Sequence, residues 1–188
     1  MTSEMIETIA VSIADRSGYD AVSLSEIARA LNVRPPSLYA HVPGKADLLS
    51  RLHRRALKHL AQLIAHATVG TSRRAALAGL IQAHRDLATQ HPGLWEALQR
   101  PADSLTIGSD EAARVSGLMT AVLQGYGLRD DDVVHAVRLV AATINGLLAL
   151  GHSGSLDYRE PLAESSWEAT TSALDRALES WPASSLAR

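Results

Sequence analysis

The chain has 188 residues, with 18 basic and 20 acidic side chains and 46% hydrophobic residues. These values are typical of a soluble globular protein and exclude a disordered polyampholyte or a low-complexity tail. Because the chain contains no cysteine, we also exclude disulfides, thiolate zinc sites and a cysteine nucleophile.

The first 31 residues predict two helices. Residues 4–17 carry a single apolar stripe with helical spacing, and Gly18 stands where such a helix would stop. Ser23 and Glu26 have the spacing of a capping box, in which each side chain accepts a hydrogen bond from the backbone amide of the other residue. A second, short helix is therefore expected over residues 24–31.

A tight turn and a proline-led helix follow. Asn32 lies at the turn, where we expect a left-handed backbone, because Asn tolerates positive φ better than most residues. Pro35 and Pro36 fit only the first turn of a helix, where their missing N–H groups would have no partner anyway. This predicts a third helix over residues 35–41, and the apolar spacing after it predicts a long fourth helix over residues 45–67.

The rest of the chain also has helical spacing, interrupted by clusters of Gly, Pro and Ser. No segment shows the alternation of a β-hairpin or the pattern of a βαβ unit. We expect an all-α fold, in which an N-terminal three-helix module is joined through a long helix to a C-terminal helical bundle. The later helices are predicted at residues 72–91, 94–100, 109–127, 130–151 and 165–181.

Neither an export signal nor a membrane span is expected. The start MTSEMIETIA carries acids where a secretory signal needs basic residues and an apolar run. The longest apolar stretch, residues 133–150, is interrupted by His135, Arg138, Thr143 and Asn145, so it matches poorly a span of about 20 apolar residues. We therefore expect a cytoplasmic protein with no membrane partner.

Basic residues are concentrated near the N-terminus. Between Arg29 and Lys58 seven Lys or Arg side chains are opposed only by Asp47. A polyanion would meet this local excess of positive charge. On charge alone, a solvated basic helix face remains the alternative.

Residues 24–45 have the order of a helix-turn-helix, in which the second helix enters the DNA major groove. Arg34 and Ser37 fall in the first turn of that helix, where Arg can pair with guanine and proline rings can touch thymine methyl groups. Side chains that follow at Tyr39, His41 and Lys45 suit phosphate oxygens. The candidate DNA contacts are Ser25, Arg34, Pro35, Pro36, Ser37, Tyr39, His41 and Lys45.

The stretch Ser23–Lys45, with its I-A-x-x-L-x-V and S-L-Y-x-H-V elements, resembles the DNA-binding domain of the tetracycline-repressor (TetR) family of transcriptional regulators. His91-Pro92-Gly93-Leu94-Trp95 and Gly125-Tyr126-Gly127-Leu128 resemble the family's WHG-type regulatory region. The resemblance implies a repressor that binds a palindromic double-stranded DNA operator as a homodimer and is released by a small-molecule effector. It implies a helix-turn-helix DNA-binding domain (1–45), a connecting helix (46–70) and a ligand-binding and dimerisation domain (71–188).

The segment 130–151 independently favours a dimer, because it is apolar almost all the way round and something beyond its own bundle must cover one face. A wholly intramolecular central helix is the alternative. The candidate interface residues are Arg138, Ala142, Gly146, Trp167 and Thr171.

For an effector pocket, we select large or polar residues expected to border the inside of the C-terminal helices, where core filling is the alternative explanation. These residues are His84, Trp95, Met119, Tyr126 and Asn145.

Other functions have weaker support. Asp132-x-x-His135 occurs once, whereas a di-metal bundle needs two such motifs, and Gly151–Ser155 does not match a nucleophile elbow. We expect no catalytic residue, metal or cofactor. A helical protein-interaction module without sequence-specific DNA binding remains the main alternative, and an all-α enzyme is a further one.

Overall fold

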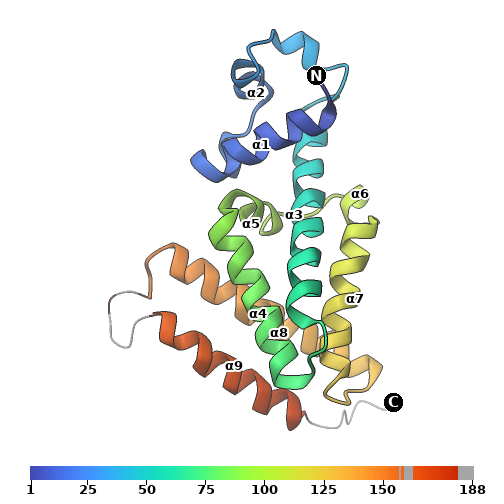
Figure 1. Cartoon of the computed structure of the whole chain (residues 1–188), viewed down its shortest axis with the longest axis vertical. Coiled ribbons are helices and arrows are strands. Elements are labelled where there is room, and N and C mark those ends of the chain that lie inside the picture. The colour runs from blue at the N-terminus through green and yellow to red at the C-terminus, as the bar shows by residue number, and fades with distance from the viewer. Residues whose placement is uncertain (157, 159–162, 182–188) are drawn as a thin grey trace. The chain divides into compact units, whose positions relative to one another are not determined.

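The computed structural model describes residues 1–156, 158 and 163–181, and every regular element in these ranges is helical (Figure 1). In chain order the elements are α1 (Ser3–Ser17), η1 (Tyr19–Ala21), α2 (Leu24–Ala30), η2 (Pro35–Leu38), α3 (Lys45–Thr68), α4 (Arg73–Gln90), α5 (Pro92–Leu98), α6 (Ser104–Ile107), α7 (Asp110–Gln124), α8 (Asp130–His152) and α9 (Ala163–Glu179). The predicted all-α class is therefore confirmed.

The chain forms two compact units. The N-terminal unit combines Met1–Leu63 with Asp86–Val115, and the C-terminal unit combines Ile64–Arg85 with Ser116–Arg188. Three helices, α3, α4 and α7, contribute residues to both units. This division by contacts differs from a simple succession along the chain, because the segment that holds α5 and α6 returns to the N-terminal unit.

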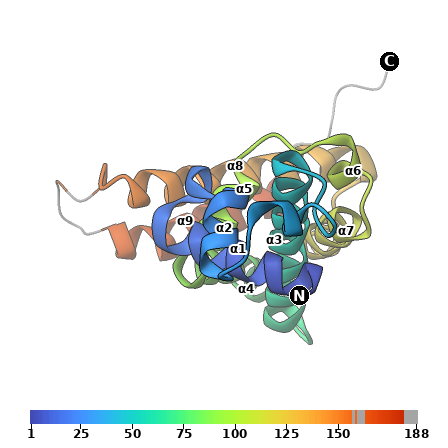
Figure 2. The same cartoon turned by 90° about the horizontal axis from the view of Figure 1, so that it is seen from above.

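In the N-terminal unit, α1 packs against α5, η1 and α2 (Figure 2). Its buried stripe, Ile6, Ala10 and Ile13, repeats every three to four residues, as expected for the core-facing side of an amphipathic helix. Gly93 makes the approach of α5 possible, because a Cβ at this position would lie 2.6 Å from the Asp15 backbone nitrogen and closer still to Ala14. Helix α1 is thus packed against a segment that is far away in sequence.

In the C-terminal unit, α8 packs against α9. One side of α8 is buried through Val133, Ala136, Val140 and Ile144, which follow helical spacing. The other side is exposed, although it is largely apolar. Between residues 134 and 150 its exposed residues are Val134, His135, Arg138, Leu139, Ala142, Gly146, Ala149 and Leu150.

Two local expectations need correction. The third helix does not reach residue 41: η2 is a single 3-10 turn from Pro35 to Leu38. Two prolines remove two backbone donors from the start, and the first amide, that of Ser37, bonds back three residues to the Arg34 carbonyl at 3.0 Å. The Ser23 hydroxyl does cap α2 at the Glu26 amide, but the Glu26 carboxylate binds Arg29 at 2.8 Å.

The short helix α6 was not among the helices predicted from the sequence. Asp103 caps this short helix by accepting a hydrogen bond from the Thr106 amide at 2.8 Å. The buried hydroxyl groups of Thr106 and Ser50 are 3.2 Å apart, which ties α6 to α3. The signal that could have found it is the Asp-x-x-Thr spacing, a weak form of the cap that revealed α2.

Candidate nucleic-acid interface

The helix-turn-helix is held together by a small apolar core. Ile27 and Ala28 of α2 are buried with Leu38 of η2 and Val42 after it. Asn32 has φ of 53° and turns the chain between the two elements, as predicted. This core leaves the opposite side of η2 exposed.

The predicted DNA contacts lie on that exposed side. Arg34, Pro35, Pro36 and Ser37 are all exposed at the start of η2, and so are Ser25 and Lys45. The Tyr39 side chain is 55% exposed, whereas His41 is half-buried. The Ser37 hydroxyl donates a hydrogen bond to the Arg34 carbonyl at 2.6 Å, which stabilises the first turn. Every residue of the predicted set is therefore at least partly exposed.

The basic residues between positions 29 and 58 differ in whether an acid pairs with them. Arg34 and Lys45 lie at the helix-turn-helix and form no ion pair within the part of the chain that the structure describes. By contrast, Arg29 is paired with Glu26, and Arg51 contacts both Asp47 at 2.7 Å and Glu7 at 3.6 Å. The cations available to DNA at η2 are therefore fewer than the sequence count suggests.

Residues that sequence reasoning did not select fasten α1 to α5. The Asp15 carboxylate accepts hydrogen bonds from the Gly93 amide at 3.0 Å and from His91 Nδ1 at 2.9 Å. The Tyr19 amide donates to Glu96 Oε2 at 2.8 Å. We call these five residues the α1–α5 junction. The only sequence signal for it was the His91–Trp95 motif, because the partner residues lie more than 70 positions away.

A second pair of contacts extends beyond this junction. Arg100 binds the exposed Asp20 at 2.7 Å, and its guanidinium lies 5.7 Å from the centre of the Tyr19 ring. Burial raises the pKa of the Tyr19 hydroxyl, with Arg100 acting in the opposite direction. These contacts position η1, and through it the start of α2.

The predicted effector residues occupy both units. Trp95 belongs to the N-terminal unit, whereas His84, Met119, Tyr126 and Asn145 belong to the C-terminal unit. Trp95, His84 and Met119 are buried, and Asn145 is half-buried with its Nδ2 donating to the Ala141 carbonyl at 2.9 Å. The five residues therefore do not belong to one unit.

His84 is a buried histidine with one ring nitrogen engaged. Its Nδ1 lies 2.8 Å from the Leu80 carbonyl oxygen, which can only accept, so Nδ1 is the protonated nitrogen of the neutral ring. Burial lowers the pKa of His84, with the backbone hydrogen bond as a smaller opposing effect. The neutral ring therefore carries Nε2 as an acceptor.

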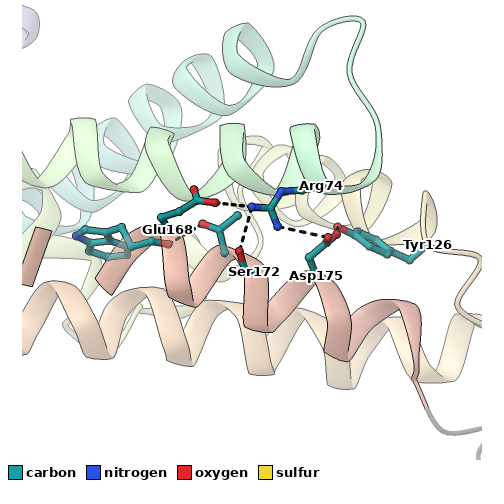
Figure 3. Close-up of polar contacts among 7 residues, drawn as sticks. Arg74, Tyr126, Glu168, Ser172 and Asp175 are labelled. Carbon is teal, nitrogen blue, oxygen red and sulfur yellow. Dashed lines mark hydrogen bonds and ion pairs between the residues drawn. The ribbon is translucent and has the colours of Figure 1, made fainter. Parts of the chain in front are cut away.

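Arg74 organises the contacts of α9 within the C-terminal unit (Figure 3). It binds Glu168 at 2.5 Å, Ser172 at 3.0 Å and Asp175 at 3.5 Å. Asp175 in turn accepts a hydrogen bond from the Tyr126 hydroxyl at 2.7 Å. Burial, the bond to Asp175 and its charge all raise the pKa of Tyr126. Tyr126, predicted to face an effector, is thus tied to α9.

The predicted dimer residues differ in exposure. Arg138, Ala142 and Gly146 lie on the exposed side of α8. Trp167 is half-buried, with the Arg85 guanidinium 5.0 Å from its ring centre. Thr171 is only 5% exposed and donates its hydroxyl proton to the Trp167 carbonyl at 2.8 Å. Within the protomer, Thr171 is therefore an internal residue of α9.

The polar residues within 133–150 predict a poor match to a membrane span, yet α8 meets the length and composition of one. Its best 18-residue window has a mean hydropathy of 1.7, and 22% of that window is buried. The interrupting polar residues do not reduce its hydropathy enough to exclude a span. A helix with this composition needs a cover for its exposed apolar side.

The fold and the exposed cationic turn define a helix-turn-helix DNA-binding regulator. Residues 9–52 match the model of the bacterial regulatory proteins of the tetR family, and residues 77–174 match the tetracyclin repressor-like C-terminal domain. The chain is 32% identical over 169 residues to YobS of Bacillus subtilis strain 168, an uncharacterized HTH-type transcriptional regulator, with 88% of this chain and 86% of YobS covered. The chain therefore belongs to the TetR family of transcriptional regulators, which are DNA-binding transcription factors and not enzymes.

Solved structures share the fold. A TetR variant from Acinetobacter baumannii AYE in complex with minocycline has a TM-score of 0.72 at 18% identity, covering 98% of this chain and 99% of that one. BioQ in complex with its double-stranded DNA operator has a TM-score of 0.70 at 21% identity, covering 96% and 99%. These likenesses establish the TetR-like all-α architecture.

Proposed function

We propose that this protein is a cytoplasmic repressor that binds a palindromic operator as a homodimer and leaves it on binding a small-molecule effector. The observation that carries the proposal is the exposed first turn of η2, where Arg34 stands beside two proline rings and Lys45 begins the next long helix. The BioQ–operator and TetR–minocycline complexes support the two halves of the proposal by analogy.

Because η2 is a single 3-10 turn, only the residues of this turn and Arg34 before it can reach base edges. We assign Arg34 to a guanine and the rings of Pro35 and Pro36 to thymine methyl groups. Ser37 lies beside Arg34 at the end that reaches base edges. Ser25, Tyr39, His41 and Lys45 are assigned to the sugar–phosphate backbone, and Lys45 adds its charge to the positive N-terminal end of α3. In this arrangement Arg34 reads sequence, whereas Lys45 anchors the protein.

Selection of bound duplexes from a random library, followed by anisotropy titrations, tests these roles. Replacing Arg34 by Ala should cost about 1–3 kcal/mol on the selected operator and relax the preference at one position per half-site. Replacing Lys45 by Ala should weaken all duplexes alike. The matched control is Arg29→Ala, because Arg29 is already paired with Glu26. Equal affinities for wild type, Arg34→Ala and Lys45→Ala would refute the assignment.

For the homodimer, we propose that the exposed side of α8 meets a second copy. Arg138, Ala142 and Gly146 lie on this side, and the small residues allow two helices to approach closely. Trp167 and Thr171 are proposed to contribute through α9, with Thr171 supporting the interface from within.

Light scattering measures the mass directly. Wild type should have the mass of two chains, and Ala142→Arg should reduce it toward one, because a long charged side chain would occupy the interface. Ala113→Arg, on an exposed position of α7 in the N-terminal unit, is the control that should remain dimeric. A monomeric wild-type protein, or one recovered only with detergent, would refute the proposal that a second copy covers the exposed side of α8.

For the effector, we propose that His84, Met119, Tyr126 and Asn145 contribute to a site in the C-terminal residues 71–188, and that Trp95 reports its occupancy. The neutral, buried His84 supports this, because its Nε2 is an acceptor for a ligand donor. Residues 1–45 would bind DNA and 46–70 would connect the two functions. A compound that stabilises the protein should also lower operator affinity, and a screen in which no stabilising compound does so would contradict effector release.

A further inference from the structure

A polar cavity of about 450 Å³ lies between α1, α3 and the start of α7 in the N-terminal unit. None of its lining residues is among the proposed DNA contacts or the residues proposed for the effector. Four cations line it, together with the acids of the surrounding helices. The cationic residues are Arg51, Arg54, Arg55 and Lys58.

These four cations share one face of α3, since their positions follow i, i+3, i+4 and i+7. Like charges at such spacing repel one another, and an anion bound between them would reduce the repulsion. Asp47 neutralises part of Arg51 through a hydrogen bond of 2.7 Å. Arg54 and Lys58 form no ion pair within the described residues of the chain.

Glu7 of α1 is the acid that faces two of the cations. Its carboxylate oxygens lie 3.6 Å from Arg51 and 3.8 Å from Arg55. These distances permit attraction but exceed those of a charge-assisted hydrogen bond, which is about 2.7–2.9 Å. The guanidinium N–H groups of the cavity therefore keep hydrogen-bonding capacity that Glu7 does not use.

We propose that this cavity binds a small multivalent oxyanion, of the kind found in phosphate esters and polycarboxylates. Arg54 and Lys58 would provide the main contacts and Arg55 a further one, because planar guanidinium groups match the oxygen pairs of carboxylates and phosphates. Glu4 and Glu7 of α1 and Glu111 of α7 line the same cavity and oppose an anion, so only a ligand with more than one negative charge gains enough attraction.

The cavity is distinct from the operator contacts. Arg54 and Lys58 follow Lys45 by 9 and 13 residues on one continuous helix, which places them about 14 and 20 Å further along its axis. A phosphate anchored at the start of α3 therefore does not occupy this cavity.

Isothermal titration of the full-length protein tests the proposal, with pyrophosphate and citrate as probes at constant ionic strength and chloride as the control. We expect saturable binding of one anion per protomer. The double variant Arg54→Gln/Lys58→Gln should lose at least about tenfold in affinity, since two charged contacts are removed. Arg176→Gln, which removes an exposed cation of the C-terminal unit, should bind like wild type.

A second variant removes one of the opposing acids: Glu111→Gln should strengthen binding about twofold or more, because its like-charge repulsion of the ligand disappears. Thermal unfolding without anion confirms that each variant folds. The proposal is overturned if neither probe binds wild type, or if the double variant binds equally well. It is also overturned if the double variant keeps its anion affinity but lowers the salt dependence of operator binding, since the cations would then contact DNA.

Discussion

The close approach of α5 to α1 predicts that Gly93→Ala destabilises the protein. A Cβ at this position would lie 2.6 Å from the Asp15 nitrogen and still closer to Ala14, and both neighbours are backbone or short side-chain atoms that cannot rotate away. The helices must then separate, which also stretches the 3.0 Å hydrogen bond from the Gly93 amide to Asp15. Overpacking of this kind costs about 1–3 kcal/mol.

Thermal and denaturant unfolding measure this cost. For a chain of this size, a loss of about 1–3 kcal/mol lowers Tm by roughly 2–12 °C. Gly117→Ala is the matched control, because nothing lies within 4 Å of a Cβ at that position of α7. In a helix this control should stabilise by about 0.5–1 kcal/mol.

The two alanine variants should therefore shift Tm in opposite directions. If Gly93→Ala unfolds like wild type, then α1 and α5 do not approach closely at Gly93, and the α1–α5 junction does not stabilise the fold.

Further predictions concern the C-terminal unit. Arg74→Ala should lower the free energy of unfolding by about 1–2 kcal/mol, because Asp175 loses its cation and α9 loses three contacts. The control Arg176→Ala should change the free energy of unfolding by less than about 0.5 kcal/mol. Equal effects of the two substitutions would contradict the role of Arg74. Burial lowers the pKa of His84 from its ordinary value of 6.5, so the unfolded chain binds a proton at this residue more readily than the folded chain. The stability that the neutral, buried His84 contributes is therefore present above pH 6.5 and is lost as the pH falls below it. His84→Gln should therefore lose less stability than wild type between pH 7 and pH 5.5, at most by about 1.4 kcal/mol per pH unit; parallel pH profiles would contradict this.

Local features of the fold could be predicted from the sequence because their causes are local. The Ser23 cap requires only a residue three positions away, and the turn at Asn32 follows from its tolerance of positive φ. The exposed face of η2 follows in the same way, since Leu38 and Val42 must be buried and their neighbours then point outward.

Contacts between distant segments could not be predicted. Nothing near Asp15 indicates that its carboxylate will bind Gly93 and His91, because that contact exists only after α5 has folded back onto α1. The same limit applies to the basic residues. The excess between residues 29 and 58 was visible, but only the fold shows that Glu7 comes from α1 to face Arg51 and Arg55.

The prediction for α9 shows a third limit. The sequence predicts Trp167 and Thr171 as interface residues, but helical periodicity alone does not indicate which side of α9 packs against its own chain. Arg85 and the α8 contact decide this, and Thr171 lies inside the protomer.

The central claim is that the exposed turn of η2 and the start of α3 bind DNA. The most direct test is the salt dependence of duplex binding by the full-length protein. We expect the logarithm of the binding constant to fall linearly with the logarithm of salt concentration, with a slope of about −0.9 for each phosphate neutralised, and Lys45→Gln should make this slope shallower by about one. Duplex binding that is absent in dilute buffer, or unaffected by salt and by Lys45→Gln, would contradict the account.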